Sequence, residues 1–253
     1  MSNLKILFWD VETAPMLAYI WRPSDDYVNS ERLIHESWMI CWAAKWAGQK
    51  KVHTGVVTPE EALEQDDSRI CKDLADLIRE ADIVVAHNGD RFDLPVLNGR
   101  LLQMDLEPIG HVSSIDTLTL ARRNFKLAYN KLDYLAESFG FGNKLKTNFA
   151  LWKSAYFGDA KALEKMRKYN IKDVVLLEQV FEKMRPYVKS LKRLIEPDYD
   201  NQFACPSCGS EDLMKRGTLT TQSATYQKYQ CNGCQRYSRS RTSFKPKFEV
   251  VPL

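Results

Sequence analysis

The sequence predicts an α/β fold followed by a small second domain. Through the first half of the chain, short apolar segments rich in β-branched and aromatic residues alternate with segments of helical periodicity. That alternation is typical of a sheet with a parallel portion. Beyond about residue 200 the helical periodicity disappears, and cysteine pairs, Gly, Ser, Thr and basic residues dominate. With 253 residues, 44% of them hydrophobic, the chain has ample material for a core.

Three strands are expected before the first long helix. Residues 4–10 are largely apolar up to Asp10 and predict a buried strand. Residues 37–48 are rich in aromatic side chains and residues 50–57 alternate in polarity, so we expect two strands that pair as a hairpin across Gly48.

The remaining elements of the first domain are mostly helical. Pro59 and an acidic run open a helical region, and residues 69–81 carry apolar side chains at the spacing of an amphipathic helix. Residues 82–89 predict a short strand. After Asp93 the spacing stays near 3.6, which predicts helices almost throughout, including a long one over 161–195.

We place a domain boundary near residue 200. Residues 1–195 form the predicted first domain, the polar, proline-containing segment 196–202 is predicted to be a linker, and 203–253 form the second domain. No run approaches the ~18 apolar residues of a membrane helix, and the N-terminus lacks a signal-peptide pattern. We therefore expect a cytoplasmic protein with no membrane partner.

Charge is distributed unevenly between the two predicted domains. The chain has 36 Lys and Arg against 33 Asp and Glu. From residue 203 onward the count is 8 against 3, which leaves 28 against 30 for the rest. A basic segment on a near-neutral body suggests an anionic polymer as partner, and a solvated basic surface is the alternative.

Two carboxylates lie at the end of the first predicted strand, in the segment FWDVETAP. Successive strand side chains alternate between faces, so Asp10 and Glu12 point the same way, with backbones about 6.6 Å apart. Carboxylates this close repel unless a cation lies between them, and oxygen ligands suit Mg²⁺ or Mn²⁺. Taken alone, the pair would more simply be a solvated strand end.

Two further segments carry acidic residues in defined positions. The segment HNGDRFD follows the strand predicted over 82–89 and ends in Asp93, with Asn88 and Phe92 before it. The segment YNIKD places Tyr169 and Asp173 at i and i+4, on one face of a helix. Without Asp173, Tyr169 would be interpreted as a core residue of that helix.

The order of these three segments carries a family resemblance. D-x-E, then N-x-x-x-F-D, then Y-x-x-x-D resembles the three motifs of the DEDD superfamily of 3′–5′ exonucleases, in its tyrosine branch. IDTLTLARR, at 115–123, resembles the segment that these proteins carry between the second and third motifs, and KLDYLAESFGF, at 131–141, resembles the helix that follows it. The resemblance covers roughly residues 4–185 and implies a ribonuclease-H-like fold, a mixed five-stranded sheet flanked by helices.

The resemblance also implies a chemistry. Two Mg²⁺ or Mn²⁺ ions would activate the attacking water and neutralise the departing 3′ oxygen. Tyr169 would orient that water, and Asp116, in the family segment, would have a structural or supporting role. The four carboxylates that would hold the ions and form the catalytic site are Asp10, Glu12, Asp93 and Asp173.

Further candidates in the first domain concern contacts to nucleic acid. Asn88 would hold the backbone around the second motif or touch the nucleotide, and Phe92 would pack or wedge against the terminal base. Trp21 and Arg22 lie in a predicted loop after the first strand, where they can stack on single-stranded bases. A loop packed on the surface is the alternative.

The second domain carries two C-x-x-C pairs separated by 22 residues: Cys205, Cys208, Cys231 and Cys234. Four thiolates suit one tetrahedral, structural Zn²⁺, and the segment between the pairs looks like a hairpin, so the domain resembles a zinc ribbon. A disulfide is disfavoured in a cytosolic chain. Cys41 and Cys71 lie in apolar or amphipathic stretches and are expected to be buried free thiols.

Basic and aromatic residues interleave in this predicted ribbon. Basic side chains can contact phosphates and aromatic rings can stack on bases, so we expect a module that binds nucleic acid. A module that docks a protein partner or only adds stability is the alternative. The candidate contact residues are Lys215, Arg216, Tyr229, Arg236, Tyr237, Arg239 and Arg241.

The sequence as a whole predicts a two-metal-ion 3′–5′ exonuclease that prefers single-stranded ends. A structure-selective endonuclease on the same metal site and a non-catalytic nucleic-acid-binding scaffold are the alternatives. The intact set of four carboxylates and Tyr169 argues against the scaffold. DNA and RNA stay equally open as substrates, because no motif reveals contacts to a 2′-OH.

Overall fold

The computed structural model describes residues 4–22, 27–142, 147–188, 203–222 and 224–246. The chain divides into two units, of which Lys5–Glu182 form the first and the chain from Lys183 onward belongs to the second. The predicted linker, 196–202, lies outside the described residues, so the boundary that we placed there stays a prediction.

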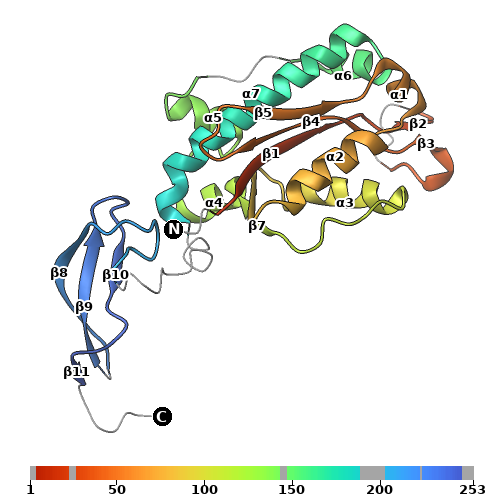
Figure 1. The fold of residues 1–253 in the computed structure, drawn as a ribbon. Coiled ribbons are helices and arrows are strands. Elements are labelled where there is room, and N and C mark those ends of the chain that lie inside the picture. The colour runs from red at the N-terminus through yellow and green to blue at the C-terminus, as the bar shows by residue number, and fades with distance from the viewer. Residues whose placement is uncertain (1–3, 23–26, 143–146, 189–202, 223, 247–253) are drawn as a thin grey trace. The chain divides into compact units, whose positions relative to one another are not determined.

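The first unit is built on a mixed five-stranded sheet with the strand order β5-β4-β1-β6-β7 (Figure 1). β1 lies at its centre, antiparallel to β4 and parallel to β6; β4 and β5 are antiparallel, and β6 and β7 are parallel. The α/β fold with a ribonuclease-H-like sheet is thereby confirmed. The strands are β1 (Ile6–Thr13), β4 (Met39–Trp46), β5 (Val52–Val56), β6 (Ile83–Ala86) and β7 (Ser113–Asp116).

Helices cover both faces of this sheet, with α2 and α3 on one face and α7 on the other (Figure 1). The predicted hairpin across Gly48 is confirmed by the pairing of β4 with β5. A short two-stranded sheet, β2 (Leu17–Ala18) with β3 (Leu33–His35), follows β1. The helices are α1 (Pro59–Glu64), α2 (Ser68–Arg79), α3 (Asp93–Gln103), α4 (Thr117–Asn124), α5 (Leu132–Ser138), α6 (Phe149–Tyr156) and α7 (Ala160–Met184).

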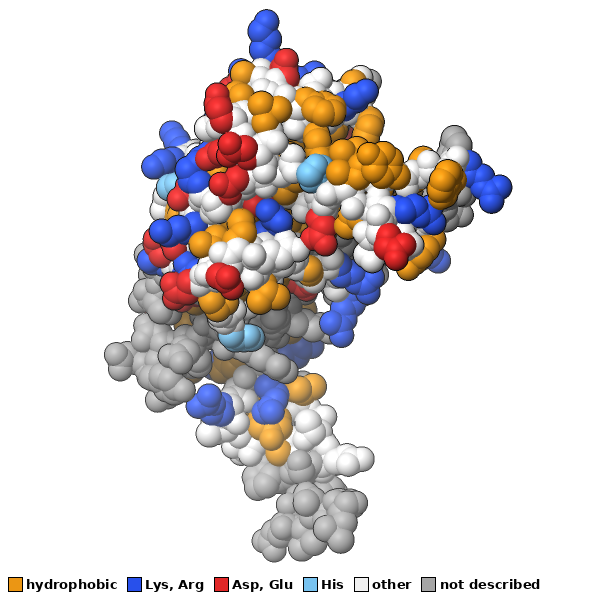
Figure 2. Space-filling model, turned by 90° about the vertical axis from the view of Figure 1, so that its right-hand side faces the viewer, with side chains coloured by type: hydrophobic (Ala, Val, Ile, Leu, Met, Phe, Trp, Pro, Cys, Tyr) orange, Lys and Arg blue, Asp and Glu red, His pale blue; other side chains and the backbone are white. Residues whose placement is uncertain are grey.

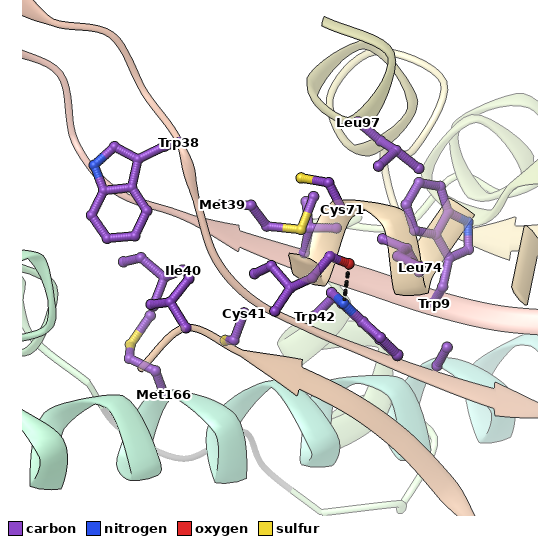
Figure 3. Close-up of a cluster of buried hydrophobic side chains, with 14 of the residues drawn as sticks. Trp9, Trp38, Met39, Ile40, Cys41, Trp42, Cys71, Leu74, Leu97 and Met166 are labelled. Carbon is purple, nitrogen blue, oxygen red and sulfur yellow. Dashed lines mark hydrogen bonds between the residues drawn. The ribbon is translucent and has the colours of Figure 1, made fainter. Parts of the chain in front are cut away.

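The alternation of side chains along β1 decides which residues face which helices. The Phe8 ring meets the Phe181 ring of α7 edge-on, with centroids 5.3 Å apart. Trp9, fully buried, points the other way and lies near Leu74 of α2 and Leu97 of α3 (Figure 3). Because the period of a strand is two, the side chains at positions 8, 10 and 12 share the face that α7 covers.

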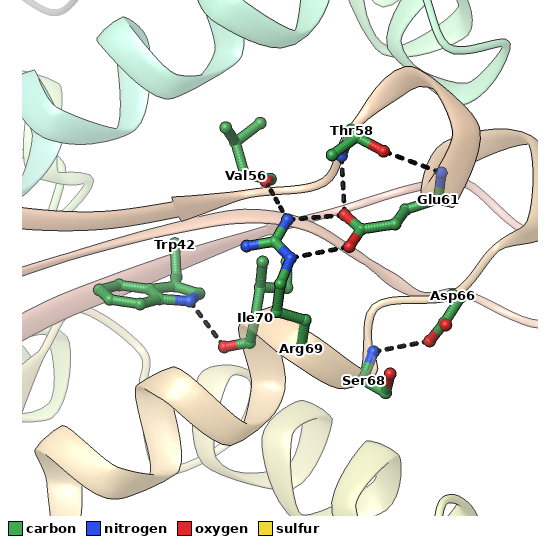
Figure 4. Close-up of polar contacts among 8 residues, drawn as sticks. All are labelled: Trp42, Val56, Thr58, Glu61, Asp66, Ser68, Arg69 and Ile70. Carbon is green, nitrogen blue, oxygen red and sulfur yellow. Dashed lines mark hydrogen bonds and ion pairs between the residues drawn. The ribbon is translucent and has the colours of Figure 1, made fainter.

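Large apolar side chains make this sheet a rigid support. Trp9, Trp38, Met39 and Ile40 are essentially inaccessible to solvent. Burying each such side chain stabilises the fold by roughly 1.5–3 kcal/mol relative to its exposed state. The indole Nε1 of Trp42 also donates to the carbonyl of Ile70 at 2.7 Å, which ties β4 to α2 (Figures 3 and 4).

A polar cluster fixes the chain where β5 passes into α1 and α2 (Figure 4). Thr58 caps α1, accepting from the Glu61 amide at 3.2 Å, while the Glu61 carboxylate accepts from the Thr58 amide at 2.7 Å. Arg69 of α2 donates to the same carboxylate and to the carbonyl of Val56. The hydrogen bond from Arg69 is the largest of the influences that lower the pKa of Glu61. The predicted helical region after Pro59 is confirmed.

Three predicted elements differ from those in the structure. The first strand runs to Thr13 and not only to Asp10, so both Asp10 and Glu12 lie within it. Residues 113–116, expected to be helical, form β7, because the edge of β6 offers a parallel partner that local periodicity does not reveal. The long helix ends at Met184 and is followed by a 3₁₀ turn containing Pro186, a residue that removes a helical donor.

The second unit contains a four-stranded sheet in which β9 pairs with β8, β10 and β11. β8 and β9 form the antiparallel hairpin that the sequence predicts between the cysteine pairs. Within the described part of the chain, no helix is long and apolar enough to cross a membrane. The strands are β8 (Leu213–Thr220), β9 (Ala224–Cys231), β10 (Tyr237–Arg239) and β11 (Lys245–Pro246).

Candidate metal centres

Three carboxylates from distant parts of the sequence meet on the α7 side of the sheet. One oxygen from each of Asp10, Glu12 and Asp173 lies within 4.8 Å of the others. Asp173 is almost completely buried, whereas Asp10 and Glu12 are partly buried. Oxygens that share one Mg²⁺ at 2.0–2.1 Å are about 3–4 Å apart, so this donor set fits a hard divalent cation after only small side-chain adjustments.

Contacts on the C-terminal side of Asp173 hold α7 against the sheet. Val174 and Leu177 are buried, and the Phe8–Phe181 contact lies two turns further on. Lys45, on the same face of β4, forms an ion pair with Glu178, and both side chains are at least four-fifths buried. If α7 moved away from β4, the two buried charges would lose their partners, which is costly. The ion pair therefore holds the helix that carries Asp173 in position.

Asp93 lies beside this cluster but not within the group of mutually close oxygens. It is the buried first residue of α3, and its Oδ1 accepts from the backbone amide of Val11 at 3.0 Å. The turn before it requires glycine, because a Cβ at Gly89 would lie 2.4 Å from the Cβ of Ala86. Asp93 is thus anchored to the backbone between Asp10 and Glu12.

Tyr169 lies on α7 one turn before Asp173, as the i and i+4 spacing predicts. Its ring meets the ring of Trp152 from α6 edge-on, with centroids 6.1 Å apart and planes at 73°. The side chain is partly buried. Its position on the carboxylate-bearing helix therefore depends on packing against α6 as well as on the helix itself.

Asn170 is a site residue that our reasoning from the sequence missed. It is completely buried, and its side-chain amide donates to Oδ2 of Asp10 at 2.7 Å. Its Oδ1 has no hydrogen-bond partner among the described residues. One feature of the sequence could have revealed it: asparagine is a poor helix former, yet it lies in the interior of a long helix. Its contact gives Asp10 a defined orientation toward the cluster.

Cys41 faces the same region, and its thiol is unreactive. It pairs with Glu12 in the β1–β4 register and is completely buried. Burial raises the pKa of the Cys41 thiol well above its ordinary value, and the charges of Glu12 and Asp10 raise it further. The thiol therefore stays protonated. Burial likewise raises the pKa of Cys71, so both are buried free thiols, as predicted.

Asp116 has the supporting role predicted for it. Its Oδ1 caps α4 by accepting from the amides of Leu118 and Thr119, at 2.8 and 3.1 Å. The same oxygen accepts from the amide of Asn88 at 3.1 Å. Asn88 has φ 75°, and its carbonyl accepts from the Phe92 amide at 3.0 Å. The backbone of Asn88 thus shapes the turn that leads to Asp93.

A cavity of about 470 Å³ opens beside the carboxylate cluster. Thr13 directly follows Glu12, and Trp152 contacts Tyr169, so two of its walls adjoin the candidate site. Aromatic and small polar side chains share the lining, which suits a flat, partly polar ligand. The lining residues are Thr13, Ala14, Pro15, Thr147, Asn148, Phe149 and Trp152.

The segment after β2 exposes aromatic side chains. Trp21 is 89% exposed and Tyr19 is 73% exposed, and Arg22 next to them is also exposed. Hydrophobic side chains gather in patches on the face shown in Figure 2. Phe92, near the second motif, is 41% exposed. These positions are accessible to a ligand, as the stacking prediction requires.

The four cysteines of the second unit also meet. Cys205 and Cys234 have sulfurs 3.7 Å apart, and Cys208 and Cys231 have sulfurs 3.6 Å apart. A disulfide would need about 2.05 Å, whereas four sulfurs at 2.3 Å around Zn²⁺ lie about 3.8 Å from one another. The donor set fits tetrahedral zinc.

Burial and nearby hydrogen bonds shift the pKa values of these thiols. Burial is the largest influence on Cys208, whose pKa lies above its ordinary value. Burial also acts on Cys231, but hydrogen bonds, first that from the backbone of Cys234, outweigh it and lower the pKa of Cys231 to about 7. The amide of Ser207 points at the sulfur of Cys205, 3.4 Å away. Only the thiolate form of a cysteine binds metal.

The candidate nucleic-acid contacts on this unit fall into two groups. Lys215, Arg216, Arg239 and Arg241 are exposed. Arg236 is instead partly buried, and its guanidinium donates to the backbone carbonyls of Val188 and Arg185 at 3.0 and 3.2 Å.

Two aromatic rings of this unit are covered by the unit's own cations. Lys228 lies 4.4 Å from the centroid of the Tyr237 ring, and Arg239 lies 3.8 Å from that of Tyr226. Tyr229 is partly buried. Each cation occupies one face of its ring, so the exposed cations are better placed than the rings to meet a polyanion.

Comparisons with known proteins agree with this architecture. No curated protein matches the sequence. A family B DNA polymerase from the hyperthermophilic archaeon Pyrobaculum calidifontis is similar in structure, with a TM-score of 0.54 and 17% identity. The match covers 73% of this chain and 25% of that polymerase, so the chain spans about a quarter of its length.

A family model describes more than half of the chain. The RNase_H superfamily model matches residues 37–185, which run from just before β4 through α7. The match begins after β1 and its two carboxylates, and it includes Asp93 and Asp173. Together with the sheet order, it shows that the chain belongs to the RNase_H superfamily.

Proposed function

We propose that this protein is a metal-dependent 3′–5′ exonuclease of the tyrosine branch of the DEDD superfamily. The observation that carries the proposal is the meeting of Asp10, Glu12 and Asp173 within 4.8 Å on a rigid, buried support. Membership of the RNase_H superfamily and the polymerase-like fold support it. The order of the three sequence motifs favours this branch over other nucleases of the same fold.

The residues have distinct roles in the proposed reaction. Two divalent cations, when bound, supply an activated water and stabilise the departing 3′ oxygen. Asp10, Glu12 and Asp173 hold these cations, with Asp93 completing the set from the neighbouring α3. Asn170 fixes the orientation of Asp10 through its 2.7 Å hydrogen bond. Tyr169 orients the attacking water through its hydroxyl, because a protonated tyrosine is a weak base.

The surroundings of the cluster suit the end of a single strand. The cavity lined by Phe149 and Trp152 can accept one base, and the exposed aromatic side chains around Trp21 can stack on others. We propose that Phe92 contacts the terminal nucleotide. These features favour an exonuclease over an endonuclease that recognises duplex structure.

The cysteine unit is proposed to be a zinc ribbon that adds affinity for nucleic acid. Its exposed Lys215, Arg216, Arg239 and Arg241 carry the phosphate contacts. A chain shortened after Asp200 should then keep its turnover at saturating substrate while its affinity falls and its salt dependence becomes less steep. Equal affinity and salt dependence in the shortened and whole proteins would favour a protein partner instead.

A panel of substrates tests the enzymatic proposal. Single- and double-stranded DNA and RNA, labelled at the 5′ end, are incubated with Mg²⁺ or Mn²⁺, with a circular strand of the same sequence alongside. We expect a ladder of products shortened from the 3′ end, an intact circle, and no products with Asp10→Asn. Cleavage of the circle would favour the endonuclease, and cleavage that persists in Asp10→Asn would overturn the assignment.

A further inference from the structure

One side of α7 carries a row of exposed lysines that the metal chemistry does not use. Lys161, Lys165, Lys168 and Lys172 are separated by four, three and four residues, so they lie along a single face of the helix. All four side chains are exposed. We call this set the α7 lysine row.

The row runs alongside the candidate active-site residues. Tyr169 directly follows Lys168, and Asp173 directly follows Lys172, so the two lines of residues are parallel and about 100° apart around the helix. From Lys161 to Lys172 the row is about 16.5 Å long at 1.5 Å per residue. It therefore runs from the turn of α7 that carries Asp173 toward the N-terminal end of the helix.

The charge of this segment is one-sided. Residues 160–172 contain five basic residues and one acidic residue, whereas residues 1–202 as a whole contain 28 against 30. The acidic residue, Glu164, forms ion pairs with Arg167 at 2.8 Å and Lys168 at 3.3 Å. The row itself contains no acidic residue, although Glu164 lies between Lys161 and Lys168 on the same side of the helix and pairs with Lys168.

The chemistry of the row selects a phosphodiester backbone. Lysines act as point charges that attract phosphates without the planar geometry needed to read bases. A hollow of about 430 Å³ lies among Lys161, Glu164, Lys165 and Lys168, with space for phosphate groups. A membrane surface would instead require bulky apolar side chains beside the lysines, and none is exposed between residues 160 and 172.

We infer that the α7 lysine row holds the phosphate backbone of the strand whose end is cleaved. This inference rests on the proposed nuclease function and adds the path of the substrate. A stacked single strand rises by about 3.4 Å per nucleotide along its axis, so the row is about as long as five stacked nucleotides. Affinity should thus increase with strand length up to about five nucleotides beyond the cleaved one.

Binding by matched variants of the full chain tests the path. A 5′-labelled single strand of twelve nucleotides is titrated in EDTA, where no cleavage occurs, with the variant Lys161→Gln/Lys165→Gln/Lys168→Gln. The control, Lys50→Gln/Lys51→Gln/Lys72→Gln, removes the same charge from exposed lysines of the β4–β5 turn and α2. Circular dichroism verifies that both variants are folded.

We expect the α7 variant to bind at least about tenfold more weakly, with the slope of log affinity against log salt reduced by about 2, since each lost single-strand contact removes ~0.7. The control should retain at least half of the wild-type affinity. Equal losses in both variants, or an unchanged α7 variant, would overturn the inference.

Cleavage of a dinucleotide, too short to reach most of the row, is measured separately. If the wild type cleaves the dinucleotide and the α7 variant cleaves it equally fast, the α7 lysine row acts in binding the strand and not in cleavage. A wild-type protein that binds the twelve-nucleotide strand but cleaves nothing would refute the nuclease proposal. The binding comparison would still show whether the α7 lysine row holds the strand.

Discussion

The two candidate metal centres of this protein are assembled in opposite ways. Asp10 and Asp173 are 163 positions apart in the sequence and meet because a buried sheet and a long helix pack together. The four cysteines come from two pairs with only 22 residues between them. Among the residues from 203 to 244 whose burial is described, only four are buried, and two of these, Cys205 and Cys231, are cysteines of the cluster.

This difference indicates that the two units depend on metal to different degrees. The first unit has an extensive apolar core that places its carboxylates whether or not a cation is present. The second unit buries too little apolar surface to be stable alone, so its metal would contribute directly to its folding. Removing a ligand should therefore abolish chemistry in one unit and structure in the other.

The largest effect is expected at the cysteines. Removing zinc with a chelator, or replacing Cys231 by Ser, should unfold the second unit, because structural zinc contributes roughly 10–16 kcal/mol in small zinc modules. Hydrogen exchange would show loss of protection in β8 and β9 with unchanged protection in β1 and β4. Restoring zinc should restore the wild type but not the variant. Protection in β8 and β9 that survives full removal of zinc would contradict this comparison.

The carboxylate site should respond in the opposite way. Asp173→Asn should lower nuclease activity by several orders of magnitude while the protein stays folded. Without metal, its thermal midpoint should equal or exceed that of the wild type, because repulsion among the three carboxylates is relieved. Activity and thermal unfolding in EDTA are measured together. A clearly lower midpoint in EDTA would mean that Asp173 stabilises the fold instead.

A smaller effect is expected at Asn170. Asn170→Ala removes a hydrogen bond to a charged group, worth about 1.5–3 kcal/mol, so metal affinity or rate should fall by roughly 10- to 100-fold. Asn124 of α4 provides a control, because it lies at an exposed position and its amide donates to a backbone carbonyl of the same helix. Titration with Mn²⁺ and the rate at saturating Mn²⁺ separate the two effects. If Asn124→Ala and Asn170→Ala behaved alike, the contact with Asp10 would have no functional role.

The smallest effect is expected at Tyr169. Phe in this position keeps the ring and its contact with Trp152 but deletes the hydroxyl. We expect a partial loss of rate, less than that caused by removing any carboxylate, since the cations still bind the water. The rate is measured at saturating metal, beside Trp152→Ala, which removes the packing and keeps the hydroxyl. A wild-type rate in Tyr169→Phe would make Tyr169 a packing residue only.

Much of the candidate site was accessible from the sequence because its signals are local. Asp10 with Glu12, and Cys205 with Cys208, have spacings short enough to fix their relative directions within one strand or one turn. The pairing of β8 with β9 and the hairpin across Gly48 were predictable for the same reason. The strand β7 was not, because its conformation depends on the neighbouring edge of β6.

The fold class, the three acidic motifs, the two cysteine pairs and the likeness to a nuclease family could be predicted from the sequence, since each depends on residue type and short-range spacing. Which oxygens meet could be seen only in the folded protein. The tertiary structure grouped Asp10 and Glu12 with Asp173, anchored Asp93 to the backbone of β1, and placed Asn170 against Asp10. The physical reason is that contacts over such separations follow from the packing of α7 and α3 on opposite faces of one sheet, and no local spacing encodes that packing.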